Sequence, residues 1–400
     1  MGYIGWQKIW FLMIFVLFMG ISGQATDAQE NQSKPLSQEL KVNKNIIRGI
    51  ELLYDWEFDK SENMFYREIA KKIDDPMGYF YLAMVTWSKL ASGFWSPKMV
   101  KHYGERIDKA ISVAKQRIQT GKADSFTYLY LGGALGFKGR FQLMQRKWFS
   151  SFLLALEAID ALKTSLEMDP NNRDVLFGLG IFDYYTARLS GMLKFLSYLL
   201  IHQGDKEEGL RKLHIAAEEA IYSTIEAKSL LLHIYLYLEP GYDKALPLAE
   251  ELANRFKEAP RNVYLQGVAY IRLDMHSKYK EVVDYLNQRR EKETSPVKAS
   301  IWGRQGIYLE ASYYLFQDQY DMARSKLQAI LSQKNPEKDP FMIAWPLLKI
   351  GMSYDLEKKR KIALNYYNSI LEMGNGAGAQ FLAEKYIDEP PEKGDPFLGY

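Results

Sequence analysis

The stretch AWPLLKIGMSYDLEKKRKIALNYYNSI, residues 344–370, carries the clearest spacing pattern in the chain. Counted from residue 344, positions 4, 7, 8, 11, 20, 24 and 27 are Leu347, Ile350, Gly351, Tyr354, Ala363, Tyr367 and Ile370. Apolar residues recur every three or four positions, which predicts two amphipathic helices. The small residues at positions 8 and 20 would let these helices approach closely, and the large residues would fill the space around the contact.

The same spacing recurs elsewhere. From residue 304 it gives Ala311, Tyr314, Tyr320, Ala323, Leu327 and Ile330, and from residue 42 it gives Gly49, Leu52, Phe58, Ser61 and Phe65. These are the characteristic positions of the tetratricopeptide repeat (TPR), a helix-turn-helix unit of about 34 residues. Weaker frames begin near residues 76, 125, 173, 226 and 260. The sequence therefore predicts an all-α, TPR-like superhelical solenoid of about eight hairpins, because each hairpin buries a face only against its neighbours.

Three consecutive units are longer than this frame. In these units the small residue at position 20 of the repeat is expected at residues 95, 144 and 192. It is found later, at Ala110, Ala158 and Gly209, which predicts helical insertions in repeats two to four. The third insertion, 190–203, contains the apolar run SGMLKFLSYLLI but is too short to cross a bilayer. It either extends the array or forms a patch that contacts lipid or a partner.

The N-terminus resembles a secretory signal. Lys8 precedes an apolar run from Ile9 to Ile21, and small residues follow, so cleavage after Ala25 or Ala28 is expected. An uncleaved N-terminal membrane anchor is the alternative. The predicted location is exported, either periplasmic or secreted. The predicted organisation is a signal peptide (1–25), a polar leader (26–37), N-terminal repeats with insertions (38–225), C-terminal repeats (226–377) and a C-terminal tail (378–400). Its final residues, IDEPPEKGDPFLGY (387–400), are proline-rich and acidic and are expected to fray.

Catalytic and cofactor motifs are absent from the sequence. There is no cysteine, and the five histidines show no metal-ligand spacing. The glycine-rich run LGGALGFKGR, 131–140, lacks the order of a phosphate-binding loop, and no G-x-S-x-G occurs. We therefore expect no enzyme activity, no cofactor and no metal. An enzyme whose catalytic groups come together only in the fold is the alternative. A net charge of +3 together with the export signal argues against nucleic acid.

Aromatic residues occupy the first-helix positions that line the concave groove in TPR proteins. The candidate partner-binding residues are Phe80, Trp87, Phe126, Phe177, Tyr184, Tyr185, Tyr237, Tyr264, Tyr308, Phe316 and Trp345. Flat rings bury a large area at low entropic cost, which suits a protein, peptide or acyl ligand. The alternative is that inserted helices already fill the groove and that these rings are core.

A basic segment is the second candidate surface. Lys138, Arg140, Arg146 and Lys147 alternate with Phe137, Phe141, Trp148 and Phe149. This pattern is typical of contacts with anionic membrane surfaces, and its alternative is an ordinary solvated helix face.

The run LFGLGIFDYYTARLSGMLKFLSYLLIHQGDKEEGLRKL, 176–213, resembles the central segment of the tetratricopeptide repeat protein 39 family, also called inclusion-body clearance proteins. The run GIYLEASYYLFQDQYDMARSKL, 306–327, resembles that family's C-terminal repeats. The resemblance implies an all-helical adaptor linked to lipid and protein-inclusion handling, without a catalytic site. The signal sequence departs from this family and favours a secreted bacterial branch.

We therefore expect a non-catalytic interaction scaffold or adaptor of the bacterial cell envelope, with a protein or peptide partner in the aromatic groove. The alternative function is a lipid- or membrane-surface-associated binding protein that uses 190–203 and 138–147.

Overall fold

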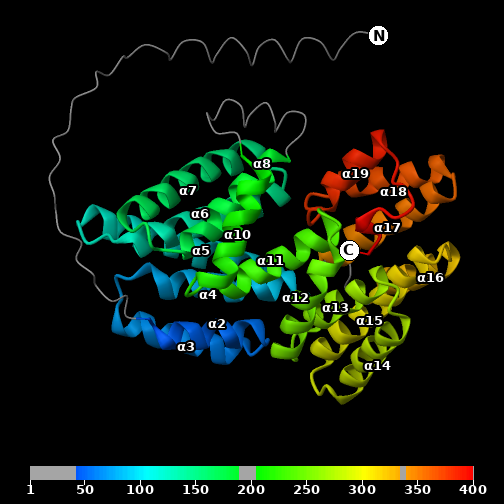
Figure 1. Cartoon of the computed structure of the whole chain (residues 1–400), viewed down its shortest axis with the longest axis horizontal. Coiled ribbons are helices and arrows are strands. Elements are labelled where there is room, and N and C mark those ends of the chain that lie inside the picture. The colour runs from blue at the N-terminus through cyan, green and yellow to red at the C-terminus, as the bar shows by residue number, and fades with distance from the viewer. Residues whose placement is uncertain (1–41, 189–203, 334–338, 400) are drawn as a thin grey trace, which may run out of the picture. The chain divides into compact units, whose positions relative to one another are not determined.

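The computed structural model describes residues 42–188, 204–333 and 339–399, and every regular element in these ranges is helical. The all-α prediction is confirmed (Figure 1). The first four hairpins are α2 (Lys44–Tyr54) with α3 (Phe58–Lys71), α4 (Pro76–Ala91) with α5 (Pro97–Gln119), α6 (Ser125–Met144) with α7 (Trp148–Met168), and α8 (Asp174–Ala187) with α10 (Lys206–Glu219). The next four are α11 (Thr224–Tyr237) with α12 (Tyr242–Arg255), α13 (Pro260–Arg272) with α14 (His276–Lys292), α15 (Pro296–Phe316) with α16 (Tyr320–Leu331), and α17 (Pro340–Leu356) with α18 (Arg360–Glu372). The helix α19 (Ala379–Asp388) and the short 3₁₀ helix η2 (Pro396–Gly399) follow.

Several helices begin where Asp-Pro pairs stand in the sequence. Asp75 and Asp339 accept hydrogen bonds from the backbone N–H groups of Met77 and Phe341, each at 3.0 Å. In both helices a proline follows at the first helical position. An aspartate cap satisfies an N–H group that has no partner inside the helix, and proline has no N–H to satisfy. The first helix of repeat two therefore starts at residue 76, where its predicted frame begins, and that of repeat eight starts four residues before its predicted frame at residue 344.

Small residues hold the two helices of a hairpin together, as the spacing predicts. The Ser61 hydroxyl donates to the carbonyl of Gly49 at 2.8 Å, and the Ser151 hydroxyl donates to that of Gly139 at the same distance. At Gly351 a Cβ atom would lie 2.6 Å from Cε1 of Tyr367. The helices are therefore too close for a larger residue at these positions.

The predicted insertions in repeats two and three lengthen the helices. In repeat one the helices have 11 and 14 residues, whereas α5 has 23 and the α6–α7 pair has 20 and 21. The third predicted insertion, 190–203, lies outside the described residues.

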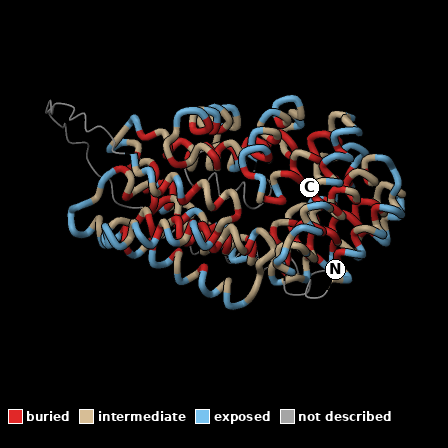
Figure 2. Tube along the Cα trace, turned by 90° about the horizontal axis from the view of Figure 1, so that it is seen from below, coloured by how far each residue is buried: buried red, intermediate tan, exposed pale blue. Residues whose placement is uncertain are grey.

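Residues from Asn43 onward form one unit with an extended core. One cluster of buried apolar side chains includes residues from α2 through α15. Figure 2 shows buried residues following the interior of the helical array, with exposed residues on its outer turns. None of the helices that the structure describes is long and apolar enough to cross a lipid bilayer.

The turn between α6 and α7 contacts the last repeat, which the repeat pattern does not predict. The Arg146 guanidinium donates to the carbonyl of Leu371 at 2.5 Å, and the Gln380 amide donates to the carbonyl of Met144 at 3.3 Å. The rings of Trp148 and Phe381 lie 5.7 Å apart. Repeats three and eight are therefore coupled directly as well as through the repeats between them.

The prediction that the tail frays is wrong. Residues 379–388 form α19, and Leu398 in η2 is 1% exposed. The tail is held by contacts with residues far away in the sequence, so its own proline-rich and acidic composition did not indicate them.

Candidate functional site

The structure divides the eleven predicted groove residues by burial. Tyr184, Tyr237, Tyr264 and Trp345 are buried; Phe80, Trp87, Phe126, Phe177, Tyr308 and Phe316 are half-buried; Tyr185 is exposed. What covers these side chains differs between the N-terminal and C-terminal repeats. We call the two groups the N-terminal inner face (Phe80, Trp87, Phe126, Phe177, Tyr184 and Tyr185) and the C-terminal inner face (Tyr237, Tyr264, Tyr308, Phe316 and Trp345).

In the N-terminal inner face, rings pack on other rings of the array. Phe80 lies 5.4 Å from Tyr130, and Phe126 lies 5.7 Å from Tyr222 between ring centroids. Trp87 contacts the ring of Phe141 edge-on at 6.1 Å. These are the separations at which aromatic pairs stabilise a core. Neighbouring rings therefore cover Phe80, Trp87 and Phe126, whereas Tyr185 in the same half is exposed.

Two carboxylates lie at the start of α11. Asp174 accepts hydrogen bonds from the backbone N–H groups of Tyr222 and Ser223, at 2.8 and 2.7 Å, and thereby fixes the start of α11. Glu226 is beside Tyr54, and burial raises the pKa of its carboxyl to about 7. Its buried Oε2 has no hydrogen-bond partner among the described residues. The first turn of α11 thus contains an acid that resists ionisation.

In the C-terminal inner face, the rings contact a segment of the chain itself. The hydroxyls of Tyr264 and Tyr237 both donate to the carbonyl oxygen of Gly399, at 2.6 and 3.3 Å. The ring of Phe397 stacks on that of Tyr237 with centroids 6.1 Å apart. Together, these contacts seat η2 against α11, α13 and α15. The aromatic face therefore binds a short peptide segment through its backbone and through an apolar side chain.

Polar contacts hold the residues before η2. Arg272 donates to the carbonyl of Gly394 at 3.1 Å, and the Tyr386 hydroxyl donates to the carboxylate of Asp395 at 2.8 Å. The same carboxylate accepts the backbone N–H of Phe397 at 2.9 Å, which starts the turn. Lys393 pairs with Asp318 at the exposed rim.

A buried lysine lies next to this segment. Lys349 in α17 is fully buried, donates to the hydroxyl of Ser312 at 2.9 Å and lies 4.1 Å from the centroid of the Tyr308 ring. Burial holds the pKa of its ammonium group well below the usual range. The hydroxyls of Ser312 and Tyr264 are 3.4 Å apart, so the lysine connects to the donor on Gly399. Lys349 makes no ion pair within the part of the chain that the structure describes.

Lys349 and Ser312 were not among the residues that the repeat pattern indicated. One signal was available in the sequence. Lys349 is the single charged residue in the apolar run FMIAWPLLKIGM, 341–352, and it stands next to Ile350, a predicted core position. A lysine there reads as an ordinary surface residue until the packing on both sides of α17 is known.

The four basic residues do not share one role in the structure. Lys138 pairs with Asp108 at 2.7 Å, and the guanidinium of Arg140 lies over the ring of Trp87 at 5.6 Å. Arg146 is engaged with the last repeat as described above, and Lys147 is exposed at the start of α7. Next to it, Phe149 is 72% exposed. Their contact with an anionic surface stays a prediction.

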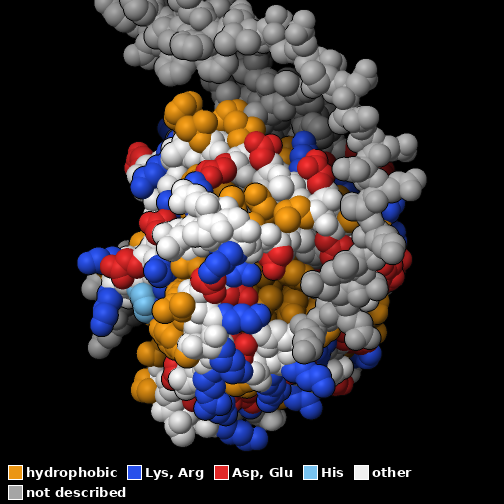
Figure 3. Space-filling model, turned by 90° about the vertical axis from the view of Figure 1, so that its left-hand side faces the viewer, with side chains coloured by type: hydrophobic (Ala, Val, Ile, Leu, Met, Phe, Trp, Pro, Cys, Tyr) orange, Lys and Arg blue, Asp and Glu red, His pale blue; other side chains and the backbone are white. Residues whose placement is uncertain are grey.

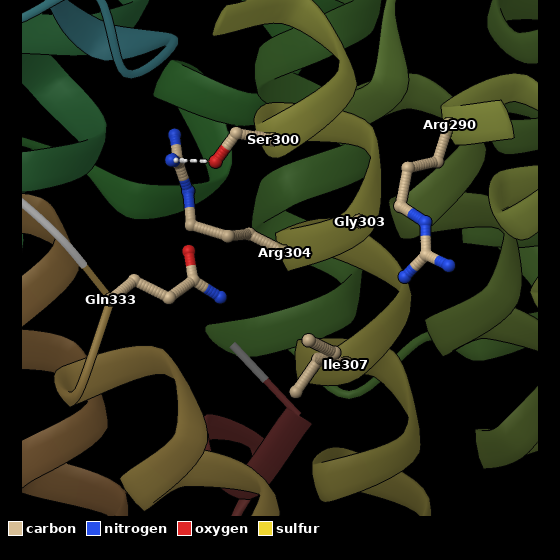
Figure 4. A pocket seen from close by; sticks show the side chains of 6 residues that line it. All are labelled: Arg290, Ser300, Gly303, Arg304, Ile307 and Gln333. Atoms are coloured by element: carbon tan, nitrogen blue, oxygen red, sulfur yellow. Dashed lines mark hydrogen bonds between the residues drawn. The ribbon is translucent and has the colours of Figure 1, made fainter. Parts of the chain in front are cut away.

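A cavity of about 330 Å³ lies along the N-terminal half of α15, and it is lined by Arg290, Ser300, Gly303, Arg304, Ile307 and Gln333. Arg304 and Gln333 lie on one side and Arg290 on the other, and Arg304 donates to Ser300 at 2.9 Å (Figure 4). Burial lowers the pKa of Arg304. The sequence analysis did not single out this cationic cavity. No group of three His, Asp or Glu side chains within residues 42–188, 204–333 and 339–399 could hold a metal.

No family model matches the chain, and no curated protein matches its sequence. Among solved structures, it is similar to a monomeric mutant of IFIT1 with Gppp-AAAA. The identity is 13% and the TM-score 0.36, over 87% of this chain and 86% of that one. A second monomeric IFIT1 mutant, with m7Gppp-AAAA in the anti conformation of the cap, gives the same values. A likeness of this size assigns no ligand to the chain. The TPR-like, all-α fold follows from the hairpins and their small-residue contacts.

Proposed function

We propose that this protein is a non-catalytic scaffold of the cell envelope that binds a segment of a partner protein on its C-terminal inner face. The observation that carries the proposal is the seating of Phe397–Gly399 on the rings of that face. Tyrosine hydroxyls there donate to a backbone carbonyl, which every peptide has, while the rings accept an apolar side chain.

The location in the envelope rests on the N-terminal residues, which are outside the described ranges. The apolar run from Ile9 to Ile21 and the small residues after it support export. The resemblance to the tetratricopeptide repeat protein 39 family supports an adaptor. Mature protein that begins between Thr26 and Gln29 in an envelope fraction is the expected result. An intact N-terminus on cytoplasmic protein would contradict it.

Partner binding is tested with a chain that begins at Thr26, immobilised with and without residues 394–400. We expect at least one of these two chains to retain one or more envelope proteins. The variant that combines Tyr264→Ala with Phe316→Ala should no longer retain them. Tyr185→Ala is the matched control, because that ring is exposed on the other half. If the double substitution does not change which envelope proteins are retained, the proposal is contradicted. Turnover of a substrate that one polar substitution abolishes without loss of folding would also contradict it.

A specific observation favours one alternative, a contact with an anionic lipid surface. Phe149 is 72% exposed and follows the exposed Lys147 at the α6–α7 turn, so an apolar and a cationic group project together. The distribution of charge argues against this alternative. On the face that Figure 3 shows, Lys and Arg side chains gather toward one end, but acidic side chains lie among them and reduce the net positive charge there. If this alternative holds, Phe149→Ser with Lys147→Glu should abolish sedimentation with anionic vesicles and leave the melting temperature unchanged.

A further inference from the structure

The segment 389–399 has two parts that differ in how they are held. Residues 389, 390 and 392–394 are exposed, and a cavity of about 630 Å³ lies beneath this loop. Leu398 and Gly399, in contrast, are buried. We call residues 389–393 the tether and residues 394–399 the anchor. The tether is mostly exposed, apart from the buried Pro391 and the ion pair of Lys393 with Asp318. The anchor can therefore leave the face by a movement of the tether that unfolds none of the repeat helices.

The anchor makes contacts that select a particular chemistry. The ring of Phe397 stacks on Tyr237, and Leu398 is enclosed. A Cβ atom at Gly399 would lie 3.1 Å from the Phe316 ring and 3.2 Å from Val268, so a larger residue there would require both side chains to shift. The polar contacts of Gly394 and Asp395 lie at the entrance, where a carboxylate accepts the hydroxyl of Tyr386. The site therefore fits the order acidic residue, proline, aromatic residue, leucine and glycine.

The anchor contacts the face through its main chain as well as through its side chains. Side-chain hydroxyls that bond to a main-chain carbonyl do not distinguish which chain supplies it, so selectivity comes from the side chains of Asp395, Phe397 and Leu398 and from the lack of a side chain at Gly399. A short tether gives the anchor an effective concentration on the order of millimolar, so it competes well with any free peptide.

We infer that residues 394–399 are the resident ligand of the C-terminal inner face, and that the face also accepts a partner segment of the Asp-Pro-aromatic-Leu-Gly type once the anchor leaves. This rests on the proposed function, since it names the chemistry of the partner and what regulates its access. The apparent affinity for the partner is then reduced by the fraction of molecules whose anchor is in place.

The test uses a fluorescent synthetic peptide with the sequence of residues 393–400, KGDPFLGY, and fluorescence polarisation. We expect the chain that lacks residues 394–400 to bind it at least about tenfold more tightly than the full chain. Peptides with Phe397→Ala or with Gly399→Leu should lose this binding. Equal affinity of the two chains, or indifference to both peptide changes, would overturn the inference.

Loss of the anchor could also unfold the last repeats, so a second form keeps every residue. A protease site inserted in the tether allows the folded full chain to be cut, and circular dichroism follows the helix content. Binding of the peptide after cutting, with helix content unchanged, supports the inference. A full chain that is dimeric by light scattering until the anchor is deleted would overturn it, because the resident segment would then come from a second copy.

The two proposals fail separately. If the chain without the anchor binds the peptide but retains no envelope protein, the resident-ligand inference stands and the proposed function fails. If an envelope protein binds the full and shortened chains equally through Tyr264 and Phe316, the proposed function stands and the inference fails.

Discussion

The N-terminal and C-terminal inner faces have the same kind of side chain at the same repeat positions and differ in what fills them. In the N-terminal face, Phe80 and Phe126 contact rings from neighbouring helices. In the C-terminal face, Tyr237 and Tyr264 hold the carbonyl of Gly399. Two buried ionisable groups differ too: the acid Glu226 lies in the first turn of α11 beside Tyr54, and the base Lys349 lies in α17 beside Tyr308.

This difference shows that the position of a residue within its repeat determines which way its side chain points. It does not determine which residues that side chain contacts. Long α6 and α7 bring further rings to the N-terminal face, including Tyr130 and Phe141. In the later repeats the rings of Tyr264 and Tyr308 also lie close together, at 5.9 Å, and the anchor packs against the same face. Rings of neighbouring helices therefore fill the N-terminal inner face, whereas the anchor occupies the C-terminal inner face.

The largest expected effect is at Trp87, whose ring lies 5.7 Å from Tyr103 and 6.1 Å from Phe141. Trp87→Ala should lower the free energy of unfolding by about 3–5 kcal/mol, since it removes buried area and leaves a cavity. Urea denaturation measures it. Phe149→Ala, at a ring 72% exposed, is the control and should change stability by no more than about 0.5 kcal/mol. A small effect at Trp87 would remove the distinction between the halves.

Glu226 should give the next largest effect, through pH. The folded state keeps a proton on this carboxyl up to about pH 7, whereas the unfolded chain releases it near its ordinary value of 4.5. Between these values the folded state binds more protons, so this group lowers stability as pH rises, by on the order of 3 kcal/mol. Relative to Glu226→Gln, the native chain should therefore become less stable from pH 4.5 to 7 in urea titrations.

Lys349 should show the opposite slope. Its pKa is lowered by burial, so the unfolded state binds the extra proton below the ordinary value of 10.5 and stability rises with pH in that window. Relative to Lys349→Met, the native chain should gain stability as the pH is raised from 7 to 10. Parallel slopes for the Glu226 and Lys349 comparisons would contradict these opposite pKa shifts.

Gly351→Leu should cost about 1–3 kcal/mol, because the new side chain would overlap Tyr367 and force α17 from α18. Hydrogen exchange should lose protection in these two helices and at the α6–α7 turn that contacts the last repeats. Gly136→Ala is the matched control, since nothing lies within 4 Å of a Cβ there and the helix should gain about 0.5–1 kcal/mol. Uniform loss of protection along the array would contradict the expected locality.

The smallest effect should come from Tyr264→Phe, which removes one hydroxyl from Gly399 and keeps the ring. A net change of about 0.5–1.5 kcal/mol is expected, and it should appear as weaker protection of the anchor, with α13 itself unaffected. An equal loss of protection in α13 would show that the hydroxyl supports the helix and not the segment.

The sequence predicted the parts of the fold that depend on residues close together in the chain. Gly351 with Tyr367, and Gly49 with Ser61, are within one hairpin, so their spacing carries the information. The anchor was misjudged because Gly399 bonds to Tyr264 and Tyr237, which lie 135 and 162 positions earlier. Whether a predicted groove ring faces another ring or a peptide depends on such distant contacts, and no periodicity encodes them.

The most direct test of the account compares hydrogen exchange at two places in the same sample. The amide of Leu398 donates to the carbonyl of Asp395 in the anchor, and the amide of Tyr130 lies inside α6 in the N-terminal half. We predict that Leu398 exchanges through an opening of lower free energy than Tyr130. Added peptide KGDPFLGY should raise its exchange further without affecting Tyr130. Exchange of both amides with the same free energy, and no effect of the peptide on either, would contradict the account.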